Sequence, residues 1–175
     1  MNRIAAATVA ALLPLAPDVP AAGQQTGQQA PPPTIQSQII GTWRTVSIVQ
    51  ERASGSKIDM FHGHVNGMSI YTSDGHYMQT NTETDTPRIA TGSWQTLTAE
   101  EALRIEKQSY AMFGTYTVNE AAKSYTVHIL GSTFPNEIGS DQVRKVTFAG
   151  NEMTFVNPTP ASVGNAVINT LRRVK

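Results

Sequence analysis

The sequence predicts an all-β protein, an up-and-down antiparallel β-barrel of about eight strands with one short helix. Segments rich in β-branched and aromatic residues recur from residue 41 to the C-terminus, and turn residues separate them. Consecutive segments form pairs with short connections, which favours an up-and-down barrel over a sandwich with long crossovers. A helical pattern interrupts this order at residues 98–110.

Three hairpins make up most of the expected barrel. The dipeptide Asp74-Gly75 predicts the first, because it supplies the positive φ angles of a two-residue turn. The polar run "NEAAK" joins the second pair of strands, and Gly150-Asn151 joins the third. We expect strands at 41–51, 67–73, 76–82, 111–118, 124–130, 141–149, 152–157 and 165–174, the last of which closes or extends the sheet.

The expected helix begins with a capping box. Thr98 stands three residues before Glu101, the spacing at which each side chain bonds the other residue's backbone. Leu103 and Ile105, with the following Tyr110, give the segment an apolar side. A single helix beside so many strands is expected to cover a barrel end or one barrel face.

The N-terminal residues differ in composition from the rest. A weakly positive start precedes the apolar stretch "IAAATVAALLPLAP", and small residues follow at Val19 to Ala21, as in a secretory signal peptide. The alternative is a disordered tail, because Pro14 and Pro17 interrupt the apolar stretch. We expect a signal peptide at 1–21, a disordered Gln/Pro linker at 22–37 and the barrel domain at 38–175, in a periplasmic or secreted protein.

Composition limits the function classes. The chain has 13 basic and 13 acidic residues, so it lacks the charge that attracts nucleic acid or an anionic membrane. No apolar run reaches the length of a membrane span, and the absence of cysteine excludes disulfides and thiolate chemistry. With no glycine-rich phosphate loop or nucleophile elbow in the sequence, we expect no cofactor. The sequence does not indicate an oligomeric state.

Two motifs resemble a known family. Gly41-Thr42-Trp43, together with Arg172-Arg173, resembles the lipocalin pattern, and the resemblance implies that Trp43 packs against Arg173 at the closed barrel end. The runs "IYTSDGHYM" and "FGTYTVNEAAKSYTVHILGSTFPNEIGSDQVRKV" resemble the bacterial and fungal lipocalin-like domain family, a calycin-type barrel. The resemblance covers residues 38–174 but departs from the family at "ASGSKIDMFHGHVNG" and "NTLRRVK". A barrel of this size holds core side chains or one small ligand.

Arg144 is the first candidate ligand contact. It shares one face of its strand with Gln142, Val146 and Phe148, and the apolar members mark that face as buried. An inward arginine is too costly without a partner. It therefore meets either an internal carboxylate or tyrosine, or an anionic group of a ligand.

Tyr116, His128 and Asp141 are the other candidate ligand contacts. Tyr116 lies on the apolar face of its strand, where it is either a core tyrosine or a ligand contact. Strand polarity places His128 outside the barrel, whereas the family resemblance favours the inside. Asp141 follows the loop "GSTFPNEIGSDQ", which either bridges two strands or forms the rim of a site. His62-Gly63-His64 lacks a third ligand nearby, so we expect no metal site.

Two functions fit this barrel. The first is a secreted or periplasmic protein that binds a small apolar or amphipathic molecule inside the barrel. The second is a cofactor-free cyclase or isomerase, which acts on a small hydrophobic substrate with Tyr116, His128, Arg144 or Asp141 for proton transfer. A barrel whose core is filled by its own side chains is a third possibility. Among these, the sequence favours binding.

Overall fold

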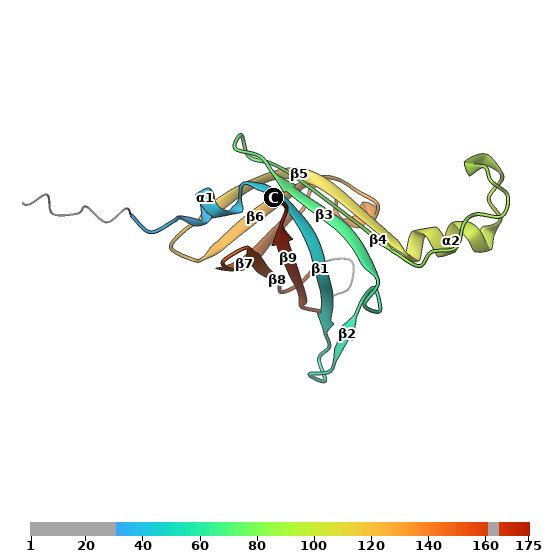
Figure 1. Ribbon diagram of the computed structural model, residues 1–175, viewed down its shortest axis with the longest axis horizontal. Coiled ribbons are helices and arrows are strands. Elements are labelled where there is room, and N and C mark those ends of the chain that lie inside the picture. Colours follow the sequence, from blue (N-terminus) through green and yellow to red (C-terminus); the bar gives the residue numbers. More distant parts are fainter. Residues whose placement is uncertain (1–30, 161–164) are drawn as a thin grey trace, which may run out of the picture. The chain divides into compact units, whose positions relative to one another are not determined.

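An antiparallel sheet of nine strands closes on itself in the computed structural model, which describes residues 31–160 and 165–175 (Figure 1). From β3 to β9 each strand pairs with the next strand in the chain, and β1 pairs with β2, β3 and β9. The eight strands other than β2 therefore form the up-and-down barrel that the sequence predicts. They are β1 (Gly41–Glu51), β3 (Val65–Tyr71), β4 (His76–Glu83), β5 (Ser109–Asn119), β6 (Ser124–Ser132), β7 (Asp141–Ala149), β8 (Glu152–Asn157) and β9 (Val167–Arg173).

Two local features of the sheet differ from expectation. The short strand β2 (Lys57–Asp59) pairs with the end of β1, in a region where the sequence departs from the family. The turn between β3 and β4 is longer than the expected two residues, because Thr72 N–H donates to the His76 carbonyl at 3.0 Å and leaves three residues, 73–75, in the loop. Its positive φ, 86°, falls on Gly75, and the Gly75 N–H donates to the Thr72 carbonyl at 3.2 Å. This is the type I turn with a following left-handed glycine that three-residue hairpin loops use.

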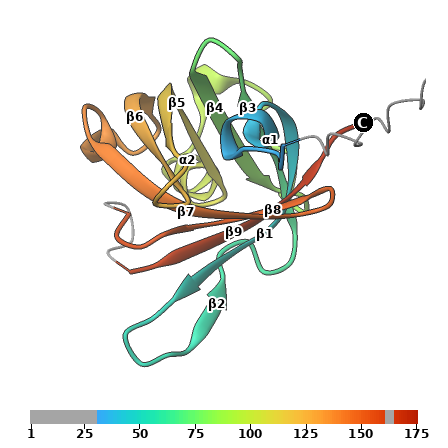
Figure 2. The same cartoon turned by 90° about the vertical axis from the view of Figure 1, so that its left-hand side faces the viewer.

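A short helix that the sequence did not predict covers one barrel end. Helix α1 (Ile35–Ile39) buries its two terminal isoleucines, and the Thr34 side chain accepts from Ser37 N–H at its start (Figure 2). The Glu120 carboxylate, from the turn between β5 and β6, accepts from the backbone N–H groups of Ile35 and Gln36 at 2.9 Å each. Folded structure thus begins slightly before Gln38. The expected signal peptide at 1–21 and most of the expected linker lie outside the described residues.

Helix α2 (Ala99–Lys107) lies at the opposite barrel end from α1 (Figure 1). Its capping box is present as predicted, with the Thr98 side chain bonded to Glu101 N–H and the Glu101 carboxylate bonded to Thr98 N–H. The 3-10 helix η1 (Trp94–Thr96) precedes it. Within residues 31–160 and 165–175, no helix has the length and apolarity needed to cross a bilayer.

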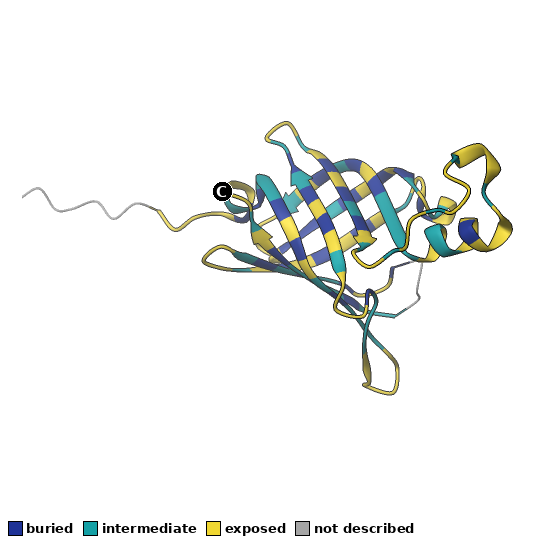
Figure 3. Cartoon of the chain, turned by 45° about the vertical axis from the view of Figure 1, so that its right-hand side comes forward, coloured by how far each residue is buried: buried dark blue, intermediate teal, exposed yellow. Residues whose placement is uncertain are grey.

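Burial alternates along the barrel strands, as Figure 3 shows. The core at the α1 end is apolar and aromatic, with Tyr71 and Tyr125 in contact edge to face. A bulge in β1 between Thr45 and Ser47 shifts the alternation by one residue, so that Ile48 also points inward.

Trp43 and Arg173 lie together at the α1 end, which is the closed end. The indole is fully buried and donates to the Ile39 carbonyl at 2.8 Å. The Arg173 guanidinium lies 4.1 Å from the indole centre and donates to the backbone carbonyls of Ile40 and Gln38. One arginine thus ties the last strand, the first strand and α1 together.

Candidate ligand-binding site

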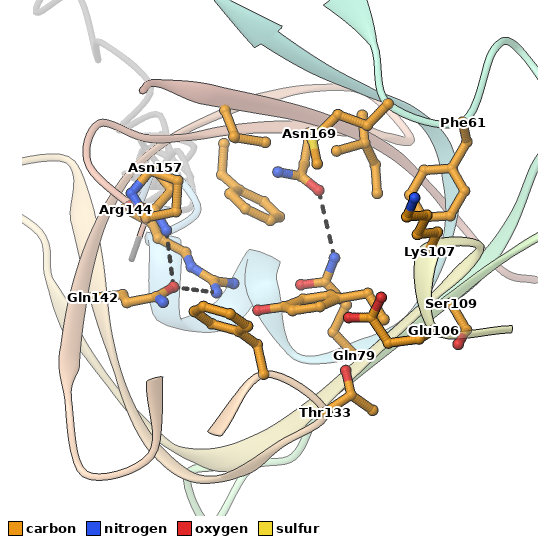
Figure 4. Close-up of a pocket in the computed structure, with 17 residues that line it drawn as sticks. Phe61, Gln79, Glu106, Lys107, Ser109, Thr133, Gln142, Arg144, Asn157 and Asn169 are labelled. Atoms are coloured by element: carbon orange, nitrogen blue, oxygen red, sulfur yellow. Dashed lines mark hydrogen bonds between the residues drawn. The ribbon is translucent and has the colours of Figure 1, made fainter. Parts of the chain in front are cut away.

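A cavity of about 410 Å³ lies inside the barrel, and Glu106 and Lys107 of α2 are among the residues that line it (Figure 4). This volume is within the range of small-molecule sites, about 300–1,000 Å³. Exposed residues from α2 and from the loop after β6, Glu106, Lys107 and Thr133, form its mouth. Its apolar wall consists of Ile48, Met60, Phe61, Phe134, Phe155, Pro160 and Val167. Its polar lining includes the amides of Gln79, Gln142, Asn157 and Asn169.

Arg144 lines this cavity from β7 and is 2% exposed. Its Nη1 donates to the Tyr77 hydroxyl at 2.7 Å, and its Nη2 lies 2.8 Å from Gln142 Oε1 and 3.2 Å from Met112 Sδ. The buried Nε has no hydrogen-bond partner in the described part of the chain. The strand alternation therefore placed Arg144 inward correctly.

The partners of Arg144 are neutral. No described carboxylate lies within 4.0 Å of its guanidinium. Aromatic rings provide partial compensation, with Phe155, Tyr77 and Tyr125 centred 4.9, 5.2 and 6.0 Å from the guanidinium carbon. Of the two internal partners that the sequence allowed, a tyrosine is present and a carboxylate is not.

The loop after β6 both buries a carboxylate and contributes to the cavity. Glu137, at the end of the 3-10 helix η2 (Pro135–Glu137), has no exposed surface. It accepts hydrogen bonds from the Tyr110 hydroxyl, from Ser132 Oγ at 3.1 Å and from Gln142 Nε2 at 3.3 Å. Phe134 lines the cavity from the same loop. The loop is thus a structural bridge and also a rim.

Gln142 connects the two buried charges. Its Nε2 donates to Glu137, while its Oε1 accepts from Arg144 and, at 2.8 Å, from Asn157 Nδ2. These contacts fix the orientation of the amide, because a flip would turn a donor toward two other donors. A second chain of bonds runs from the Tyr77 hydroxyl to Gln79 Oε1 and from Gln79 Nε2 to Asn169 Oδ1 at 3.4 Å.

The phenols around this network remain neutral near pH 7. Burial is the largest cause that raises the pKa of Tyr77, and the same holds for Tyr71 and Tyr125. Burial also raises the pKa of Tyr110, and its hydrogen bond to the Glu137 carboxylate adds to the effect. These groups therefore act as hydrogen-bond donors and acceptors, and not as phenolate bases.

Tyr116 points into the barrel but lies outside the cavity. Its ring meets Tyr71 edge to face at 5.4 Å, and its hydroxyl donates to the Thr72 carbonyl at 2.8 Å. Burial raises its pKa. Because these contacts belong to the turn between β3 and β4, at the α1 end of the barrel, Tyr116 occupies the position of a packed core tyrosine.

His128 and Asp141 lie on the outer surface, where His128 Nδ1 is 2.7 Å from Asp141 Oδ1. Their side chains are 47% and 66% exposed. The reason is the alternation of β6, which turns Val127 and Ile129 inward. Strand polarity thus placed His128 correctly, and the inward placement that the family resemblance favoured is wrong.

The surface histidines of the loop before β3 do not form a metal cluster. His62 Nδ1 lies 3.3 Å from Glu83, and His64 Nδ1 lies 2.8 Å from Asp85. Across the described ranges, no three His, Cys, Asp or Glu side chains come close enough to hold a metal ion.

Several cavity residues were missed at the sequence level, although their strands carried a signal. Gln79, Asn157 and Asn169 share the inward face of their strands with large apolar or aromatic residues. Polar residues at apolar positions of an alternating strand indicate a polar barrel interior. Glu137 gave no such signal, because it lies in a loop.

A family model described as a lipocalin-like domain matches residues 40–169, which include most of the barrel. No curated protein is similar enough in sequence to match the chain. The strand order, the closed end at Trp43 and the interior cavity agree with the family match. The chain belongs to the lipocalin-like domain family.

Proposed function

We propose that this protein binds a small amphipathic molecule in the barrel cavity. A lipocalin-like barrel suggests small-molecule binding in general. The observation that carries the proposal is the cavity of about 410 Å³, whose apolar wall surrounds a few converging polar groups. This combination is typical of sites that bury most of a small ligand and orient it by a few hydrogen bonds.

Binding has more support than catalysis. A cyclase or isomerase needs proton-transfer groups within reach of one substrate. Of the residues considered for that role, Arg144 lines the cavity, whereas Tyr116, His128 and Asp141 do not. The cavity phenol of Tyr110 stays protonated, because burial and the Glu137 carboxylate raise its pKa. No observation on the cavity specifically favours the enzymatic function.

A fluorescence titration with N-phenyl-naphthylamine, an uncharged apolar probe, tests the proposal. Thr133→Trp, at the mouth, should weaken binding by about tenfold or more, because the large indole competes for the space that the probe needs. Thr117→Trp adds the same side chain to an exposed position on β5 and should leave affinity unchanged. Equal affinities in both variants would show that the probe binds elsewhere. Native mass spectrometry of the purified protein then identifies any retained ligand.

We also propose that the chain is exported. Support comes from the apolar stretch near the N-terminus and the small residues at Val19 to Ala21 that follow it. We expect material from an extracytoplasmic fraction to begin near Ala22, and intact mass spectrometry measures this directly. Recovery of the complete chain from the cytoplasm alone would contradict export.

A further inference from the structure

We infer that the ligand is an amphipathic anion whose acidic group binds at Arg144, with its apolar part directed toward the cavity mouth. This inference rests on the proposed function, because it specifies the ligand of the same cavity. Inside the barrel, the positive charge of Arg144 has no carboxylate within 4.0 Å in the described part of the chain. Arg144 is a cation that is only 2% exposed, and its hydrogen-bond acceptors in the described part of the chain are the Tyr77 hydroxyl, Gln142 Oε1 and Met112 Sδ.

A buried cation of this kind lacks the partner that usually offsets its desolvation. Charges inside proteins are paired with opposite charges, because removing an ion from water costs several kcal/mol. Neutral hydrogen-bond acceptors and aromatic rings recover part of that cost. Arg144 Nε remains without a partner among residues 31–160 and 165–175. An anionic group in the cavity beside the guanidinium completes the charge balance.

The other charged residues near the cavity do not fill this role. Glu137 is buried, but its carboxylate is already bonded to Tyr110, Ser132 and Gln142, and the Gln142 amide lies between it and Arg144. Glu106 and Lys107 line the mouth, where both are exposed and their fields are screened by solvent. Among the lining residues, all of which the structure describes, Arg144 is the only charged residue that is buried.

The distribution of apolar residues gives the ligand's direction. Ile48, Phe61 and Val167 form a separate apolar cluster and also line the cavity. In Figure 4, Phe61 of this cluster lies on the side of the cavity where Lys107 of the mouth lies, and Arg144 lies on the other side. An acidic group at Arg144 therefore leaves the apolar part of the ligand against these side chains. Gln142 and Asn157 lie beside Arg144 and can bond further oxygens of the head group (Figure 4).

A pair of fluorescent probes separates this inference from the proposed function. Anilinonaphthalene sulfonate carries an anionic sulfonate, and N-phenyl-naphthylamine has the same ring skeleton without it. We expect the wild-type protein to bind the sulfonate more tightly than the uncharged probe. Arg144→Met should weaken sulfonate binding by about 10- to 100-fold, the loss expected for a charge-assisted hydrogen bond, and change the affinity of the uncharged probe by less than about threefold.

A cation-removing variant outside the cavity is the matched control. Lys145→Met removes a charge from the outer face of the same strand. It should change the ratio of the two affinities by no more than about twofold. A ratio that Arg144→Met leaves unchanged, or a wild-type preference for the uncharged probe, would overturn the anionic ligand while leaving small-molecule binding intact. Failure of both probes to bind would contradict the anionic ligand and the proposed small-molecule binding together.

A displacement experiment needs no variant, so it decides the question even if Arg144→Met does not fold. Decanoate and decanol share an alkyl chain and differ in the charge of the head group. Decanoate should displace the bound sulfonate probe at a concentration about tenfold lower than decanol. Equal displacement by the acid and the alcohol would contradict a site for anions.

Discussion

Replacement of Glu137 by glutamine should destabilise the barrel although the two side chains have nearly the same shape. The Glu137 carboxylate has no exposed surface and receives donors at both oxygens. Tyr110 and Ser132 donate to Oε2, and Gln142 donates to Oε1. A glutamine offers one oxygen and one NH₂ group. If its oxygen serves Tyr110 and Ser132, its NH₂ group faces the NH₂ group of Gln142. If its oxygen serves Gln142 instead, the hydroxyls of Tyr110 and Ser132 accept from its NH₂ group, and their own protons lose the carboxylate acceptor.

Gln142 cannot relieve this conflict by turning over. Its Oε1 already accepts from Arg144 and Asn157, so a flip would only move the donor-to-donor contact to those residues. A buried donor left without an acceptor costs about 1–3 kcal/mol. Loss of the negative charge also weakens the remaining bonds from Tyr110 and Ser132. We therefore expect Glu137→Gln to lower the free energy of unfolding by about 2–3 kcal/mol.

Urea denaturation followed by circular dichroism measures this change. The midpoint should fall while the m-value stays constant, because the surface exposed on unfolding is unchanged. Glu106→Gln is the matched control, since Glu106 is exposed and should tolerate the same substitution. A Glu137→Gln variant as stable as the wild type would show that the buried network does not constrain the amide orientations as described.

Four further changes test other parts of the structure. Arg144→Met should leave the melting temperature of the ligand-free protein unchanged or higher. The reason is that the Tyr77 hydroxyl still donates to Gln79, and Gln142 Oε1 still accepts from Asn157. A clear decrease would assign Arg144 a structural role. Arg173→Met should lower the free energy of unfolding, measured by urea denaturation, by about 1–3 kcal/mol, because the carbonyls of Gln38 and Ile40 lose a charged donor. An unchanged free energy would show that Arg173 does not stabilise the closed end of the barrel. Lys123→Gly should raise the free energy of unfolding by about 1 kcal/mol, because Lys123 has a φ of 50° that glycine adopts without strain. A decrease would contradict the left-handed backbone conformation of residue 123. The Thr72 hydroxyl, with His76, lowers the pKa of Asp74 to about 2. The stability that this carboxylate contributes is therefore present above its ordinary pKa of 3.8 and lost as pH falls toward 2. An NMR titration of Asp74 with a midpoint near 3.8 would contradict the lowered pKa.

The barrel was predictable because its signals are local and repeated. Alternation along β6 and β7 fixed which side chains face inward, including Arg144. The capping box of Thr98 and Glu101 fixed the start of α2. Each of these patterns depends on neighbouring residues in one element, so tertiary structure was not needed to interpret them.

The cavity was harder to predict because its contacts join residues that are distant in sequence. Arg144 and Tyr77 bond each other across the barrel, and Tyr110 reaches Glu137 from another strand. Strand polarity gives the face of a residue but not its height along the barrel axis. For that reason Tyr116, which faces inward, could not be distinguished from Arg144 as a cavity residue. Helix α1 was missed because its short apolar face is stabilised by the barrel end and by Glu120.

The methionines of the chain provide the most direct test of ligand binding inside the barrel. Met60 lines the cavity, and Met112 contacts Arg144, whereas Met68 and Met78 are exposed on the outer surface. NMR spectra of protein labelled with carbon-13 at the methionine methyl groups can be recorded while anilinonaphthalene sulfonate is added. If the probe binds beside Arg144, its aromatic rings should shift the Met60 and Met112 signals and leave those of Met68 and Met78 in place. Shifts confined to Met68 and Met78 would place the probe on the outside of the barrel and contradict an interior binding site.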